Sequence, residues 1–224
     1  MKRIVMLFCV MLFLAGFAIL LYPTISNWFY SSQQKESISQ YMSAVEELSE
    51  KDYQLMWLDA KEYNRSLLQK SNPYHLTDEE YMTYLSILNI FQNGMMGYLK
   101  IPKIHLELPI YHGTEEPVLQ KAVGHIPGSS LPTGGENTHC VLTGHRGLPS
   151  AKLFTDLDKL REGDLFTLCV LDQELVYEVY QILVTDPSDL SAIELIEGKD
   201  YCTLMTCTPY GINTHRLLIC GRRI

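Results

Sequence analysis

The 224-residue chain lacks several patterns that commonly mark a binding or structural site. Its six cysteines form no Cys-x-x-Cys pair and show no cysteine–histidine spacing typical of zinc. No block of lysine and arginine marks a phosphate-binding face, and the formal net charge is −8. That acidity argues against a nucleic-acid partner. No internal repeat or low-complexity tract stands out, so we expect one domain with appendages and neither metal nor cofactor.

The cysteines also argue against a fully disulfide-bonded framework. Cys9 lies in an apolar N-terminal run, which leaves the five cysteines Cys140, Cys169, Cys202, Cys207 and Cys220. An odd number cannot pair completely, so one thiol must have another explanation. Cys202 lies five residues before Cys207 and therefore on the opposite face of a shared strand. We interpret Cys140, Cys169, Cys202 and Cys220 as packing residues.

The N-terminus carries a membrane signal. Ile4 to Tyr22 is free of charge over about 19 residues, a length that just spans a bilayer core of about 30 Å. A cleaved signal peptide is the competing interpretation, but its apolar region is typically only about 7–15 residues long and no clear cleavage site follows. Lys2 and Arg3 would stay inside, which predicts a single-pass membrane protein with everything after Tyr30 outside the cell. No second apolar run follows Gly221.

We divide the chain into an anchor (1–22), a helical stalk with a lid segment (23–94) and a β-rich domain (95–224). Polar sequence begins at Ser31–Glu36, which we interpret as the juncture between the anchor and the stalk. Residues 37–69 favour a helix. Pro73 breaks that helix, because proline disfavours helix at the residue before it. Thr77 and Glu80 have the spacing of a capping box for a helix that runs through Ile90 and ends at Asn93-Gly94.

From Gly97 onward, short apolar runs alternate with glycine and proline, which favours a closed barrel or a sandwich. The expected strands are Gly97–Ile101, Leu108–Tyr111, Ala122–His125, His139–Thr143, Asp164–Leu171, Glu174–Val184, Tyr201–Thr206 and His215–Gly221. Short helices are expected at Ala151–Leu160 and at Ser191–Glu197.

One pair of residues in this domain suggests catalysis. Cys207 ends the β-prone run Thr203–Cys207, a turn follows, and Arg216 stands nine residues further on, in the next apolar run. A thiolate is a nucleophile and a nearby cation favours it. Free cysteines are more often buried small hydrophobic residues, so the spacing alone is only suggestive.

Three segments taken together resemble the His, Cys and Arg motifs of sortases, and the wider sequence resembles the pilus-building class C. They are Leu142-Thr143-Gly144-His145-Arg146, Thr203-Leu204-Met205-Thr206-Cys207 and Asn213-Thr214-His215-Arg216. The other segments that resemble class C sortases are Gly128–Pro132, Gly147–Phe154, Thr208–Ile212, Tyr98–Ile104 and Tyr22–Asn27. The resemblance implies a mainly β fold, an eight-stranded sortase-type closed barrel.

The same resemblance implies a cysteine transpeptidase. Cys207 would be the nucleophile, His145 the acid and base, and Arg216 the cation beside the oxyanion. The substrates would be pilins or surface proteins with LPxTG-type sorting signals, cut between Thr and Gly through a thioester. In the pilus class a lysine amine of the next pilin resolves the thioester. Two alternatives stay open: attachment of surface proteins to peptidoglycan, and a non-catalytic scaffold that binds sorting signals.

Class C sortases usually carry a lid with Asp-Pro-aromatic in the active site, and this chain has Asn72-Pro73-Tyr74 at the matching place. An amide is held less strongly than a carboxylate beside Arg216 or the thiol, which suggests a looser, weakly inhibitory lid. The other interpretation is a plain turn between two helices. Thr206 precedes the nucleophile, and we expect it either to contact substrate or to form a local hydrogen bond.

Overall fold

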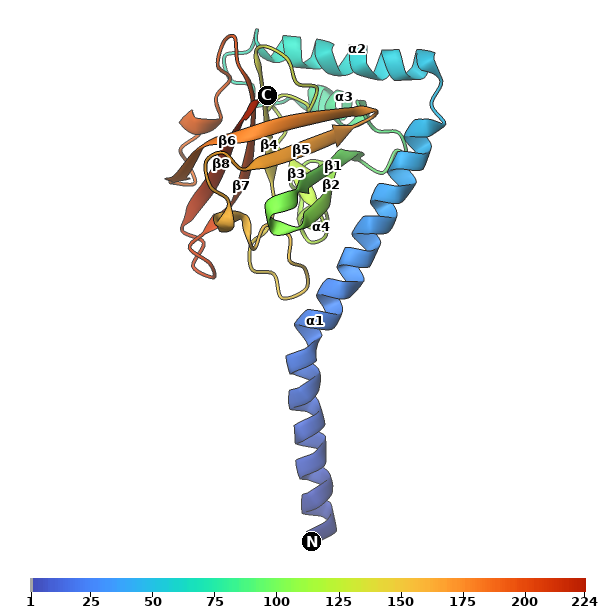
Figure 1. Ribbon diagram of the computed structural model, residues 1–224, viewed down its shortest axis with the longest axis vertical. Coiled ribbons are helices and arrows are strands. Elements are labelled where there is room, and N and C mark those ends of the chain that lie inside the picture. The colour runs from blue at the N-terminus through green and yellow to red at the C-terminus, as the bar shows by residue number, and fades with distance from the viewer. Residues whose placement is uncertain (1) are drawn as a thin grey trace.

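The computed structural model describes residues 2–224 and places a closed eight-stranded barrel beside a long N-terminal helix (Figure 1). The neighbour order is β1-β2-β3-β4-β7-β8-β6-β5, and β5 pairs with β1 to close the barrel. The pairs β2–β3 and β4–β7 are parallel and the others antiparallel. The bounds are β1 (Met95–Ile101), β2 (Leu106–His112), β3 (Val123–His125), β4 (Thr138–Thr143), β5 (Leu165–Val170), β6 (Gln173–Thr185), β7 (Asp200–Thr208) and β8 (His215–Arg223).

The predicted barrel is therefore confirmed, and every expected strand overlaps an observed one. Alternation explains the agreement, because inward residues such as Cys202 and Leu204 on β7, and Leu217 and Ile219 on β8, belong to one buried core. The cysteines interpreted as packing residues, Cys140, Cys169, Cys202 and Cys220, are all buried and unpaired.

Helix α1 (Lys2–Glu46) is continuous, so the predicted juncture at Ser31–Glu36 is wrong. Contacts with the barrel hold this polar stretch in the helix. Gln34 donates to the Lys121 carbonyl at 2.7 Å, and the buried Tyr41 hydroxyl donates to the Met96 carbonyl at 3.0 Å and accepts from the Leu171 amide at 2.8 Å. By length and composition α1 can cross a membrane, and its apolar run is exposed.

The stalk contains two further helices, α2 (Glu50–Leu67) and α3 (Asp78–Ser86). The single helix expected over residues 37–69 is split, because the Ser49 hydroxyl accepts from the Asp52 amide at 3.2 Å and starts α2 anew. The capping box of Thr77 and Glu80 is confirmed. α3 ends earlier than expected, since the backbone turns left-handed at Leu88, whose side chain is buried.

The expected helix at Ala151–Leu160 is wrong. Only a single 3₁₀ turn forms there, η2 (Leu157–Lys159). The buried residues Phe154, Leu157 and Leu160 are three apart, a spacing that suits a 3₁₀ turn better than a full α-helix. The second expected helix is likewise a 3₁₀ turn, η3 (Ser191–Ile193), and two short helical segments were not expected, η1 (Pro102–Ile104) and α4 (Glu116–Leu119).

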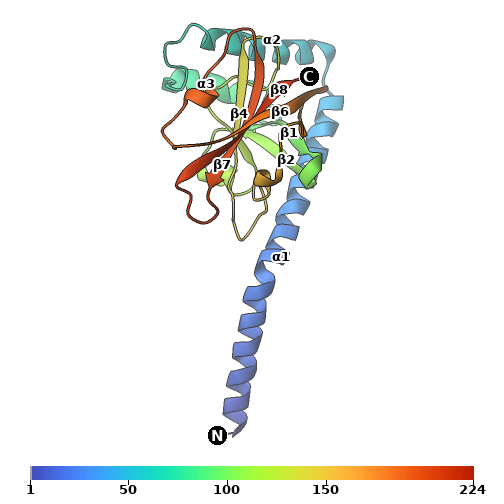
Figure 2. The same cartoon turned by 60° about the vertical axis from the view of Figure 1, so that its left-hand side comes forward.

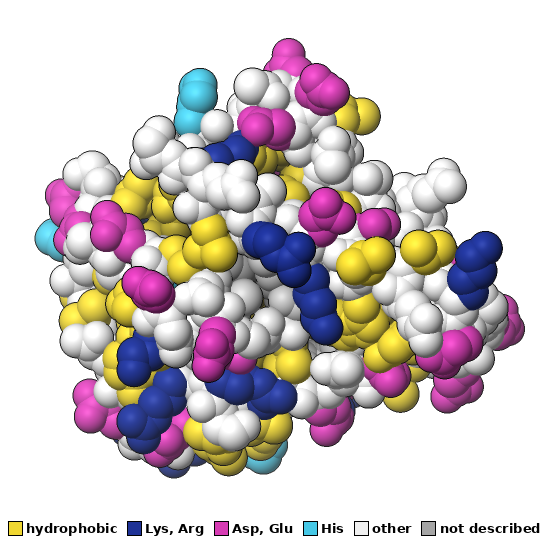
Figure 3. Space-filling view, turned by 90° about the horizontal axis from the view of Figure 1, so that it is seen from above, with side chains coloured by type: hydrophobic (Ala, Val, Ile, Leu, Met, Phe, Trp, Pro, Cys, Tyr) yellow, Lys and Arg dark blue, Asp and Glu magenta, His cyan; other side chains and the backbone are white. Residues whose placement is uncertain are grey.

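The barrel has two distinct ends along α1. Helix α2 crosses the end remote from the N-terminus, whereas α4 and the β7–β8 turn lie at the end that faces back along α1 (Figures 1 and 2). Seen from the α2 end, side chains of both charges are interspersed with small apolar areas (Figure 3).

Candidate active site

Cys207 and Arg216 are direct partners across the antiparallel pair of β7 and β8. On the other side of β8, Arg216 is the partner of Thr185, the last residue of β6. Directly opposed residues point to the same face of a sheet, with Cβ atoms about 4.5–5.5 Å apart. The three side chains therefore form one row across the ends of three strands, here called the catalytic row.

His145 joins the catalytic row from β4. In the parallel pair β4–β7, Thr143 is the partner of Met205. The Gly144 amide donates to the Met205 carbonyl at 3.2 Å, so the register continues past the strand end. Two further residues along both chains bring His145 beside Cys207. The nucleophile, acid–base and cation motifs thus meet on neighbouring strands at one end of the barrel.

The catalytic row opens on the outside of the barrel. On β8, Leu217 and Ile219 belong to the interior core, while Leu218 packs in a separate outer cluster with Ile193 and Met205. Because side chains alternate along a strand, Arg216 shares the outer face with Leu218. Both Cys207 and Arg216 are half-buried. The apolar outer face next to the thiol gives an extended chain a surface on which to lie.

Thr206 points the other way, into the barrel. Its side chain is buried, and its hydroxyl donates to the Gly144 carbonyl at 2.7 Å. Thr206 thus forms a hydrogen bond within the protein, but to a residue 62 positions away and not the local bond that was expected, and its side chain does not line the outer face. This hydrogen bond joins Gly144, the residue before His145, to Thr206, the residue before Cys207.

Two further contacts clamp the His145 loop to the end of β7. Arg146 donates to the Thr208 hydroxyl at 3.2 Å and pairs with Asp158 at 2.5 Å. The Tyr210 ring lies over Gly147, where a Cβ atom would come within 2.8 Å of the ring and the backbone is left-handed with φ +81°. Only glycine allows this approach without strain.

A carboxylate that sequence reasoning did not find lies beside His145. Glu116 Oε2, on α4, is 3.4 Å from His145 Nε2. This nitrogen is buried and makes no hydrogen bond, so the contact is a close charge contact. Gln120 donates to the other Glu116 oxygen. The Gln120 hydrogen bond, and then His145, lower the pKa of Glu116, which is therefore anionic at neutral pH.

Thr185 was also missed. Its hydroxyl oxygen is buried and has no hydrogen-bond partner, although it stands next to Arg216 in the catalytic row. A buried hydroxyl without a partner is costly, which makes it a candidate donor to a bound peptide. Nothing in the sequence distinguishes Thr185 from other strand-end threonines.

Arg216 is available to a ligand. Its guanidinium donates to its neighbour's carbonyl, that of His215, at 3.3 Å, and within residues 2–224 it forms no ion pair. Asp186 follows Thr185, and its pKa is lowered by hydrogen bonds from Ser188 and to a smaller degree by the charges of His215 and Arg216. The same described residues contain no group of three or more His, Cys, Asp and Glu side chains able to hold a metal ion.

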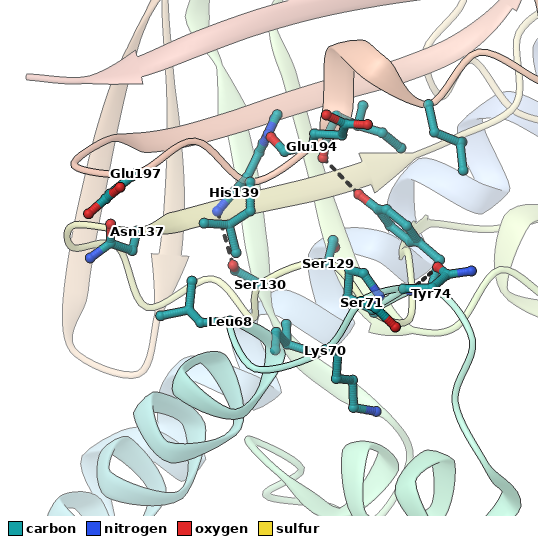
Figure 4. A pocket seen from close by; sticks show the side chains of 17 residues that line it. Leu68, Lys70, Ser71, Tyr74, Ser129, Ser130, Asn137, His139, Glu194 and Glu197 are labelled. Atoms are coloured by element: carbon teal, nitrogen blue, oxygen red, sulfur yellow. Dashed lines mark hydrogen bonds between the residues drawn. The ribbon is translucent and has the colours of Figure 1, made fainter.

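The predicted lid residues lie elsewhere. Asn72, Pro73 and Tyr74 line a cleft of about 720 Å³ together with residues near the start of β4 and the β6–β7 loop (Figure 4). The Tyr74 hydroxyl donates to the Ile193 carbonyl at 2.7 Å, and Asn72 Oδ1 accepts from the Tyr74 amide at 3.2 Å. Neither Cys207, His145 nor Arg216 lines this cleft.

The lid and the catalytic row therefore occupy different parts of the outer face. Gly128 supports the lid, because a Cβ there would come within 2.7 Å of the Tyr74 Cα. Ser129 and Ser130 bond to Val141 and His139 on β4, whereas His145 follows the end of this strand. Val141 precedes His145 by four positions, about 13 Å for an extended chain. The expectation that residue 72 lies beside Arg216 or the thiol stays a prediction.

Comparisons with known proteins agree with this architecture. The family model for the sortase domain matches residues 99–224. Sortase D of Bacillus subtilis (strain 168) is 37% identical over 131 residues, 57% of this chain, and the match spans 63% of that relative's length, just under two thirds. Sortase A of Bacillus anthracis is 22% identical over 220 residues, covering 98% of this chain and 94% of the relative.

Solved structures extend the likeness to class C. The crystal structure of sortase C1 from Streptococcus agalactiae has a TM-score of 0.82 and 49% identity, covering 84% of this chain and 98% of that one. Sortase C of Streptococcus pneumoniae gives 0.74 and 44%, covering 84% and 96%. Clostridium perfringens sortase C with its C-terminal cell wall sorting motif gives 0.74 and 42%, covering 84% and 98%.

Proposed function

The chain belongs to the sortase family of cysteine transpeptidases, and from this premise we propose that it joins pilin subunits through a Cys207 thioester. The observation that carries the proposal is the catalytic row, in which Cys207 stands opposite Arg216 and beside His145. The class C likeness of the solved structures supports pilins as the substrates.

In the first half-reaction the Cys207 sulfur attacks the threonine carbonyl carbon of an LPxTG-type signal. The carbonyl oxygen becomes an oxyanion, and the free Arg216 guanidinium donates to it. The C–N bond to glycine then breaks while His145 gives its proton to the leaving amine. The product is a thioester between Cys207 and the threonine acyl group, which splits one difficult amide exchange into two easier steps.

In the second half-reaction a neutral lysine amine of the next pilin attacks the thioester carbonyl. His145 takes a proton from the attacking nitrogen, and the Cys207 sulfur leaves as the thiolate. An isopeptide bond results and the enzyme returns to its starting state. Two hydrogen bonds keep His145 beside Cys207 through both steps. Thr206 donates to the Gly144 carbonyl, and Arg146 donates to the Thr208 hydroxyl.

Glu116 acts here as a positioning residue for His145. Its carboxylate lies 3.4 Å from His145 Nε2, and the Gln120 hydrogen bond keeps that carboxylate in place. The contact limits the orientations that the imidazole ring can adopt while it exchanges protons with the two amines.

The lid is proposed to restrict one end of the outer face and not the thiol itself. Tyr74 packs with the outer cluster that continues to Met205, two residues before Cys207. Release of the Tyr74–Ile193 hydrogen bond would uncover the cleft and extend the apolar surface that leads to the catalytic row. We further propose that α1 anchors the chain in the cell membrane, with Lys2 and Arg3 inside and the barrel outside the cell.

An acceptor assay tests the proposed function. The full chain is incubated with a pilin bearing an LPxTG-type signal, with and without a peptidoglycan stem peptide. We expect lysine-dependent polymers that disappear with Cys207→Ala and when the acceptor lysine is replaced by arginine. Transfer only to the stem-peptide amine would instead establish the anchoring reaction. Sorting-signal binding with no covalent product would establish the scaffold.

A further inference from the structure

We propose that the tip of the β7–β8 turn, formed by Tyr210 and Ile212, rests on the surface of the membrane that α1 spans, so that the catalytic row opens at headgroup level. The partner is the lipid bilayer. The inference rests on the membrane anchoring included in the proposed function, and it adds a second contact with the bilayer made by the catalytic domain itself.

The first step is that α1 fixes the direction of the barrel. The helix runs without a break from Lys2 into the stalk, and its buried residues Ile38 and Tyr41 dock on the barrel. The hydrogen bonds of Gln34 and Tyr41 to the barrel backbone prevent the two parts from turning independently. The end of the barrel that carries the β7–β8 turn points back toward the N-terminus in both views (Figures 1 and 2).

The second step is the height of that end above the apolar run. The Lys152 amide donates to Asn27 Oδ1 at 2.8 Å, which ties the loop after His145 to α1. Asn27 lies five residues beyond Tyr22, about 7.5 Å along a helix. One headgroup layer is about 5–7 Å thick. The loop at Lys152 therefore lies at the outer edge of the headgroups, and the β7–β8 turn reaches down to nearly the same level in Figures 1 and 2.

The third step is the chemistry of the tip. Tyr210 is 59% exposed and Ile212 68% exposed. An aromatic ring with a hydroxyl suits the interface between lipid and water, and the exposed Trp28 and Phe29 of α1 lie at the same depth. At the opposite end, the exposed surface around α2 carries mixed charges (Figure 3). The apolar tip thus lies at about the same depth as the aromatic belt of the anchor.

Tryptophan fluorescence in vesicles tests the contact. The full chain is reconstituted in vesicles that contain lipids with a nitroxide quencher on the acyl chain just below the carbonyl. In a background of Trp28→Phe and Trp57→Phe, the reporter is Ile212→Trp, with Tyr210→Trp as a second reporter should the first not fold. The matched control is Leu68→Trp at the α2 end, where the leucine is 49% exposed. Trp57→Phe alone leaves Trp28 to report on the anchor.

We expect the tryptophan at position 212 to lose emission to a degree comparable with Trp28, while the one at position 68 keeps its emission. Quenching of Trp28 with no quenching at 212 and 210 would overturn the inference and leave the anchor and the proposed chemistry intact. Absence of quenching at Trp28 would overturn the membrane anchoring together with the inference. Peptide acylation at Cys207, measured on the same samples, shows separately whether the proposed chemistry holds.

Discussion

Cys207 lies directly opposite Arg216 across the antiparallel pair of β7 and β8. This pairing places a thiol and a permanent cation on the same outer face, at neighbouring Cβ positions. Because strand register determines it, neither residue can move relative to the other without slipping the whole hairpin. The hairpin therefore fixes the backbone positions of the two residues before any substrate arrives, as the proposed oxyanion role of Arg216 requires.

The oxyanion role of Arg216 predicts a loss confined to catalysis. Arg216→Ala should lower kcat for sorting-signal cleavage by roughly 10²–10³, the loss typical of removing one oxyanion donor. Arg216→Lys should recover only part of it, because an ammonium group lacks the planar guanidinium fork. Arg222→Ala, on the same strand and face but paired with Glu178, is the control and should keep kcat. Equal losses for both variants would indicate damage to β8 as a whole.

Glu116→Gln should lower kcat for sorting-signal cleavage with little change in KM, because the His145 ring loses the charge contact that orients it. Because Glu116 is exposed, high salt should reduce the difference between wild type and variant. Glu115→Gln is a matched control, since Glu115 accepts from Tyr81 and not from His145. Equal kcat values for wild type and Glu116→Gln would refute the positioning role.

Loosening of the lid should depend on Tyr74 and not on the charge of residue 72. Tyr74→Phe removes the hydrogen bond to Ile193, worth about 0.5–1.5 kcal/mol, and should make the segment 70–76 more sensitive to proteolysis. Asn72→Asp should leave both protease sensitivity and turnover unchanged, because residue 72 is exposed and the cleft that it lines does not include Arg216. Slower turnover with Asn72→Asp would favour the charge-held lid that the sequence suggested.

The barrel should lose stability in mild acid. Burial lowers the pKa of His112 from 6.5 to about 4, so the folded state keeps this ring neutral while the unfolded chain becomes protonated. The contribution is fully present above pH 6.5 and is lost as the pH falls toward 4, on the order of 3 kcal/mol in total. Burial also lowers the pKa of His139.

Thermal melts of wild type and His112→Gln between pH 7 and pH 4 test this expectation. The glutamine amide can still donate to the Gly94 carbonyl but does not titrate. The variant should show a shallower decline of Tm over this window. Parallel declines in the two proteins would assign the acid sensitivity to other groups.

The strands could be predicted because their signal is local. Most strands of this barrel are short apolar runs bounded by glycine, proline or a polar turn, a signal that lies within the strand itself. The helical segments were harder. Ser31–Glu36 reads as a juncture by composition, but Gln34 binds a carbonyl on the barrel, and only the fold supplies that partner.

The residues of the candidate site also differ in whether a local sequence motif marks them. Cys207, His145 and Arg216 each lie in a short motif at or just past the end of a strand, so they could be proposed from the sequence by resemblance. Glu116 precedes His145 by 29 positions on a four-residue helix, and no motif marks it. Its approach to His145 follows from the parallel pairing of β2 with β3, a long-range contact. The position of Tyr74 likewise depends on partners distant in the sequence, Gly128 and Ile193.

The central claim is that Cys207 forms an acyl intermediate in the row with His145 and Arg216. Intact-mass spectrometry of the full chain after incubation with an LPxTG peptide tests it most directly. The account predicts an added mass equal to that of the peptide fragment ending in threonine less one water, located on Cys207, retained in Cys9→Ala and absent from Cys207→Ala. An unmodified wild-type protein, or an adduct that persists in Cys207→Ala, would contradict it.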